Sequence, residues 1–121
     1  MTFFADVPQH ADLAARLAPI RAHFLSTLGP RLDRLTVFLT TPAGDVPPPA
    51  ATLRQLQEDA HKIRGVAPTL GFDALGHSAA LADDLLDPWH NALADLPVSD
   101  AVRAALSDLR DHIATALAAG A

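Results

Sequence analysis

Apolar residues recur every three or four positions along most of this 121-residue chain. The clearest run lies in the middle of the chain and consists of Leu53, Leu56, Ala60, Ile63 and Ala67. This spacing places all five on one face of an α-helix, and such a face is normally buried against other helices. Alanine and leucine dominate the composition and only 5% of residues are aromatic, so strand-forming residues are few. The pattern therefore predicts an all-α fold.

Prolines and glycines divide this pattern into separate segments. In chain order we expect a short helix near 9–18, a long helix near 20–40 that could kink at Pro30, a proline-rich loop over 40–50, a helix from Thr52 closed by Pro68 and Gly71, a helix from Phe72 to Leu86, and a last helix with Ser99 or Asp100 at its N-cap. Four amphipathic helices and a short leading one predict an antiparallel four-helix bundle with an additional short N-terminal helix, in a single domain over 1–121.

Charge and composition exclude several classes of function. The formal net charge is −5 and no basic stripe is present, which argues against a nucleic-acid partner. The chain has no cysteine, so disulfides and thiol chemistry are excluded. The opening MTFFADVPQHADL has no basic region before an apolar run, which predicts neither a signal peptide nor a membrane span. We therefore expect a cytoplasmic protein, and the initial methionine favours a stand-alone protein over a domain excised from a larger kinase.

The segment HKIRGVAPTLGFDAL, residues 61–75, places glycines in a region that should be helical. Glycine weakens a helix interior by about 1 kcal/mol relative to alanine, so Gly65 calls for a reason. His61 lies one residue, or about 100°, from the buried position Ala60 and therefore leans toward solvent. Because helical side chains slope toward the N-terminus, a side chain at position 65 would crowd the imidazole. Glycine there leaves room for a larger group to approach His61.

Polar and basic residues lie near this histidine on the same helix. Gln57, Glu58, Arg64 and Gly65 lie three or four positions from His61 and share its helix face. Arg64 supplies a permanent cation whose planar fork suits phosphate oxygens, and Lys62 adds a charge that is less directly aimed. Neutral imidazole is a nucleophile that forms covalent intermediates, so the arrangement favours transfer of a phosphoryl group to the ring.

The run AHKIRGVAPTLGFDAL resembles the signature of histidine-containing phosphotransfer (HPt) domains. That signature has a histidine, a basic residue three positions later, and then glycine, a small residue and glycine at fixed spacing; here these are His61, Arg64, Gly65, Ala67 and Gly71. The preceding FLSTLGPRLDRLTVFL is similar, more loosely, to the helix before the phosphorylated helix of that family. The resemblance implies a four-helix bundle with an added N-terminal helix.

By this resemblance, His61 would be phosphorylated at Nε2, Arg64 would support the phosphoryl group, and Gly65 would admit the partner. We take His61, Arg64, Lys62 and Gly65 as the transfer site, and Gln57, Glu58 and Pro68 as partner-binding residues. The expected partners are receiver domains of response regulators, a hybrid histidine kinase, or both. The receiver would contribute magnesium, so we expect no metal or cofactor on this chain. No nucleotide-binding loop is present, which implies a phosphoryl carrier rather than a kinase.

Other readings of the sequence remain open. The chain could be a non-catalytic helical interaction module in which His61 is an incidental surface residue.

Pro68 departs from the expected continuation of the helix and should end or bend it early. The remaining histidines show no metal-binding spacing, although His77 could come near His61 from the next helix. We expect Trp89 to cap one end of the core, and three aspartates to form a solvated helix end rather than a magnesium site: Asp83, Asp84 and Asp87.

Overall fold

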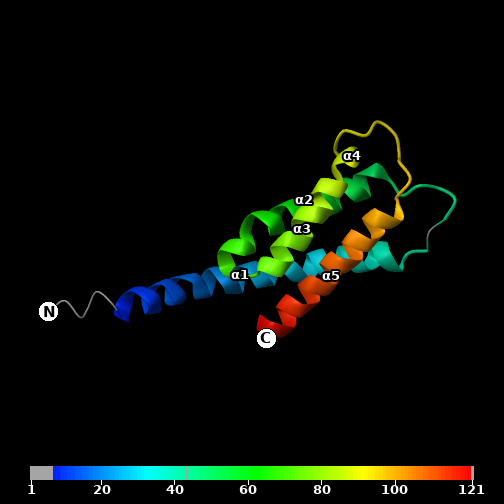
Figure 1. The fold of residues 1–121 in the computed structure, drawn as a ribbon. Coiled ribbons are helices and arrows are strands. Elements are labelled where there is room, and N and C mark those ends of the chain that lie inside the picture. Colours follow the sequence, from blue (N-terminus) through cyan, green and yellow to red (C-terminus); the bar gives the residue numbers. More distant parts are fainter. Residues whose placement is uncertain (1–6, 43, 121) are drawn as a thin grey trace.

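A computed structural model describes residues 7–42 and 44–120, with side chains from Leu13 onward (Figure 1). Its helices are α1 (Val7–Thr40), α2 (Ala50–Val66), the 3₁₀ helix η2 (Pro68–Leu70), α3 (Asp73–Leu85), α4 (Asp87–His90) and α5 (Asp100–Gly120). No strand occurs within these residues, and the predicted all-α bundle is confirmed. The signal-peptide prediction depends in part on residues 1–6, which lie outside the described part.

The four long helices form a closed set of contacts in which each packs against two others: α2 on α3, α3 on α5, α5 on α1 and α1 on α2. The predicted apolar face of α2 is buried along its whole length, from Leu53 to Ala67. Leu28, Leu106 and Ile113 meet it from the other helices with no exposed surface. Burying one such side chain stabilises the fold by about 1.5–3 kcal/mol, so this shared core fixes how α2 and α3 lie against each other.

The first 34 helical residues form one element, so the predicted break between a short helix and a long one is wrong. Pro19 and Pro30 both lie inside α1. The ring of a proline normally clashes with the Cβ of the residue before it when that residue is helical, but the residue before Pro30 is Gly29, which has no Cβ. Leu28 and Leu35, on either side, are almost fully buried. Their burial offsets the cost of about 3 kcal/mol for an interior proline.

The N-terminal half of α1 extends past the other helices (Figure 1). Leu13 and Ile20 are apolar residues at helical spacing in this half of α1, and both side chains are more than half exposed because no other helix covers them. Within the described residues, no helix combines the length and the apolar character needed to cross a bilayer.

The corner between α2 and α3 is built from Pro68 and two glycines. As the sequence predicts, α2 ends just before Pro68, and the chain continues into η2. Gly71 then adopts φ 88°, a left-handed conformation that glycine reaches without steric cost. On α3, Gly76 packs so closely on the ring of Pro68 that a Cβ at position 76 would lie 2.6 Å from Pro68 Cγ. This contact holds the end of α2 directly against α3.

The opposite end of the bundle is closed by side chains from the connection between α4 and α5. Asp95 Oδ1 accepts a hydrogen bond from the backbone N–H of Ala50 at the start of α2. Ser99 Oγ accepts one from the N–H of Val102, which confirms the predicted N-cap of α5. Trp89 is buried in the core and donates its Nε1–H to the carbonyl of Leu96, as expected for a residue that caps the core.

Candidate functional site

His61 lies on the outer side of α2 with 75% of its side chain exposed. Its neighbour Ala60 is fully buried, which agrees with the rotation of about 100° between consecutive helical residues. A groove of about 730 Å³ runs beside His61 toward α4, and Arg54 and His90 lie along it. The imidazole is therefore open to a macromolecular partner.

A carboxylate from α3 holds the ring. Asp83 Oδ2 lies 2.9 Å from Nδ1 of His61, although 22 residues separate the two in sequence. The Asp83 side chain is only 9% exposed, so the imidazole covers it from the solvent side. We predicted that Asp83 belongs to a solvated helix end, and this is wrong, because its side chain is buried. Its neighbour Asp84 is indeed exposed, which matches that expectation.

The protonation of Asp83 determines which nitrogen of His61 carries the proton. Burial by itself would raise the pKa of Asp83, but hydrogen bonds from His61, Gln57 and Arg64 outweigh burial and lower it below the ordinary value of 3.8. Asp83 is thus ionised at neutral pH and can only accept hydrogen bonds. In the neutral ring Nδ1 must then be the protonated nitrogen, which leaves the lone pair on Nε2. That nitrogen is therefore the one with a lone pair available for attack on a partner group.

Gln57 supports this pair from inside the bundle. As its position predicts, Gln57 lines the same groove as His61, but its side chain is buried, with only 7% exposed. Its Nε2 donates to the backbone carbonyl of Asp83 and to Oδ1 of Asp87, both at 3.1 Å. The position of Gln57 on α2 points its side chain into the α2–α3 contact, where it fixes the segment that carries Asp83.

The two predicted cations near His61 have carboxylate partners. Arg64 Nη1 lies 2.8 Å from Asp84 Oδ1 and 3.3 Å from Asp83 Oδ2. The hydrogen bond to Asp84, together with Asp83, raises the pKa of Arg64 above its ordinary value, so Arg64 stays charged. Lys62 Nζ pairs with Glu58 Oε1 one turn earlier at 2.9 Å, and both side chains are more than half exposed.

Gly65 leaves open space one turn after His61. A Cβ built at position 65 would meet no atom within 4 Å outside its own helix backbone. The open space that we predicted beside the imidazole, at position 65, is therefore present. Pro68, which we predicted to bind the partner together with Gln57 and Glu58, is exposed at the start of η2, just after the end of α2.

His77 does not meet His61; the α3 residue that does is Asp83. Within the described residues, no group of three or more histidine or acidic side chains is placed to hold a metal ion.

Comparison with known proteins identifies the family of this chain. The model of the Hpt domain family matches residues 19–118, which include His61, Arg64, Gly65 and Asp83. Searches of curated proteins and of solved structures give no significant match. Since the family model spans most of the chain, the protein belongs to the Hpt domain family, the histidine phosphotransfer domains of two-component signalling.

Proposed function

We propose that this protein is a phosphorelay intermediate that accepts a phosphoryl group on Nε2 of His61 and passes it to the aspartate of a receiver domain. One observation carries the proposal: an exposed imidazole whose Nδ1 lies on a buried, ionised carboxylate. A histidine that merely contacts solvent has no need of such a partner. Family membership supports the same chemistry.

In the proposed step, the lone pair of His61 Nε2 attacks phosphorus in the acyl phosphate of a receiver aspartate. The N–P bond forms, the bond between phosphorus and the aspartyl oxygen breaks, and the receiver keeps a free carboxylate. No proton has to move, because Nδ1 holds the only ring proton throughout. Phosphoryl transfer of this kind depends mainly on positioning and on charge stabilisation.

Asp83 would favour this step in two ways. It keeps the proton on Nδ1, so that Nε2 stays available as the nucleophile. As the N–P bond forms, positive charge develops on the imidazole, and the carboxylate 2.9 Å from Nδ1 stabilises that charge. In the reverse direction the same contact lets the ring leave as the neutral tautomer.

Arg64 would support the phosphoryl group after exchanging one partner. Its contact with Asp84 is a surface ion pair, since 42% of Arg64 and 67% of the Asp84 side chain are exposed. Ion pairs this exposed to solvent contribute little to stability, so the guanidinium can turn to a phosphoryl oxygen at little cost. Lys62 and Glu58 lie on the adjacent turn, where a docked receiver would meet them.

The proposed partners are receiver domains of response regulators, a hybrid histidine kinase, or both, with magnesium bound on the receiver. Gly65 would leave room for the receiver surface, and Pro68 would border it. We also propose the cytoplasm as the compartment of this protein.

The test is transfer of ³²P from phosphorylated receiver domains of the source organism to the purified protein. We expect label that is labile in acid and stable in base, as for a phosphoramidate, and its loss in a His61→Gln variant. His77→Gln, which changes an exposed histidine of α3, is the matched control and should keep the label. Label that survives His61→Gln would refute the proposal. Failure of the wild-type protein with every receiver would favour the interaction module instead.

A further inference from the structure

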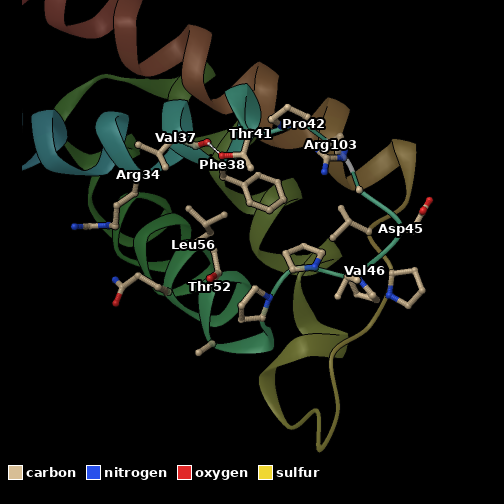
Figure 2. A pocket seen from close by; sticks show the side chains of 18 of the residues that line it. Arg34, Val37, Phe38, Thr41, Pro42, Asp45, Val46, Thr52, Leu56 and Arg103 are labelled. Atoms are coloured by element: carbon tan, nitrogen blue, oxygen red, sulfur yellow. Dashed lines mark hydrogen bonds between the residues drawn. The ribbon is translucent and has the colours of Figure 1, made fainter.

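A cavity of about 1000 Å³ lies where α1 ends and where α2 and α5 begin (Figure 2). Its walls come from Val37 and Phe38 of α1, from Leu56 of α2, and from Val98 and Arg103 around the start of α5. His61 does not line this cavity. The phosphotransfer site therefore leaves it unexplained.

The cavity has the character of a small-molecule site. Such sites have volumes of about 300–1000 Å³, are mainly apolar, and carry a few polar groups that orient the ligand. Phe38 and Leu56, which are 7% and 2% exposed, form the apolar floor of the cavity, and Pro42 and Pro47–Pro49 line another side of it (Figure 2). A ligand with an apolar body would find contacts on three sides.

Arg103 provides the polar group. Its guanidinium carbon lies 5.0 Å from the centroid of the Phe38 ring, so the cation is held at the cavity wall. No carboxylate within the described residues forms an ion pair with Arg103, and the two aspartates of the lining, Asp33 and Asp45, are exposed to solvent. Arg34, the other arginine of the lining, is already bound to Asp59 through two hydrogen bonds of 2.7 Å.

We propose that this cavity binds a small amphipathic carboxylate. Its carboxylate would pair with Arg103, whose planar fork suits two oxygens, and its apolar body would lie against Phe38, Leu56 and Val98. The proposal does not depend on phosphotransfer by His61, because the binding can be measured without a receiver.

The experiment is a titration of the ¹⁵N-labelled protein with decanoate, kept below its micelle concentration and followed by NMR. We expect saturable shifts of the amides of Val37, Leu56, Val98 and Arg103, with no shift at His61. Arg103→Gln should weaken binding by about tenfold or more, as should replacing decanoate with uncharged decanol. Arg110→Gln, which changes another half-exposed arginine of α5 outside the cavity, should leave the affinity unchanged.

A second pair of variants keeps the test independent of the folding of Arg103→Gln. Val37 is 66% exposed, so its replacement should not disturb the core. Val37→Asp places a negative charge in the lining and should weaken decanoate binding, whereas Val37→Asn should not. Equal binding to Arg103→Gln and wild type, equal binding of decanol, or shifts that spread to Leu13 and Ile20 would each overturn the proposal, as would no saturable shift at all.

Discussion

Asp83 Oδ2 lies 2.9 Å from Nδ1 of His61, and the same oxygen lies 3.3 Å from Nη1 of Arg64. One buried oxygen therefore orients both the proposed nucleophile and the cation beside it. Gln57 fixes the backbone of Asp83 from the inner side. The exposed ring is thus held by groups of the bundle itself, and the geometry exists before any partner arrives.

The first prediction concerns the carboxylate. Asp83→Asn keeps the size of the side chain but removes its negative charge, and its amide can accept or donate, which weakens the preference for the proton on Nδ1. We expect phosphorylation of His61 to slow by about 10- to 100-fold, because the ring loses the stabilising charge and a smaller share of it has a free Nε2 lone pair. Ring ¹⁵N shifts should show protonated Nδ1 in the wild type and a larger share of the Nε2–H tautomer in the variant.

Asp84→Asn is the control for this prediction. It removes a carboxylate that contacts Arg64 but not His61. We expect its transfer rate to stay within about threefold of wild type. Equal slowing in both variants would mean that the net charge of this surface, rather than the contact with Nδ1, sets the rate.

The second prediction concerns the open space at position 65. Gly65→Ala adds a Cβ that meets nothing within 4 Å, so it should stabilise α2 by about 0.5–1 kcal/mol. Gly65→Leu should likewise fold, yet it should slow transfer from a receiver much more than the alanine variant does. Circular dichroism and thermal unfolding report stability, and transfer rates report access. Transfer at the wild-type rate in the leucine variant would contradict our account of Gly65.

The third prediction concerns the α2–α3 corner. In Gly76→Ala the new Cβ would lie 2.6 Å from Cγ of Pro68, which is part of a ring and has little freedom to move. We expect a loss of about 1–3 kcal/mol in the free energy of unfolding, measured with urea. Adding Pro68→Ala should restore part of that loss, because it removes the clashing ring. Additive losses in the double variant would show that the contact is not the cause.

The fourth prediction follows from the lowered pKa of Asp83. A carboxyl group whose pKa is lower in the folded protein stabilises the fold above its unfolded pKa, and this contribution disappears as pH falls through the folded value. The stability difference between wild type and Asp83→Asn should therefore be present at about pH 5 and should shrink below the ordinary value of 3.8. Urea unfolding at a series of pH values measures it. A difference that persisted to about pH 2 would exclude this origin.

Helix content and core positions could be predicted from sequence because they depend on local periodicity. The stripe from Leu53 to Ala67 is buried as expected, and Ser99 caps α5. The continuity of α1 could not be predicted from sequence, because prolines such as Pro19 and Pro30 usually end a helix. Burial of Leu28 and Leu35 outweighs that local preference, and it depends on residues far along the chain.

In the candidate site, too, the features set by one helix could be predicted and those set by the packing of two helices could not. The exposure of His61 and the space at Gly65 follow from positions on one helix, and the structure has both. Asp83 could not be recognised, because its contact with His61 depends on how α3 lies against α2. One signal was available: Asp83 follows Ala79 and Ala82 closely, and both lie on the buried face of α3, so a solvated position was not assured.

The unbroken α1 has a consequence for the motion of the protein in solution. At about 1.5 Å per residue its 34 residues span about 50 Å, whereas a compact globule of this chain length has a radius of gyration near 14 Å. The protein should therefore tumble anisotropically and scatter X-rays as an elongated particle. A hinge at Pro19 would bring the N-terminal part of α1 back toward the bundle and reduce the maximum dimension, so small-angle scattering from dilute solution measures whether α1 is straight.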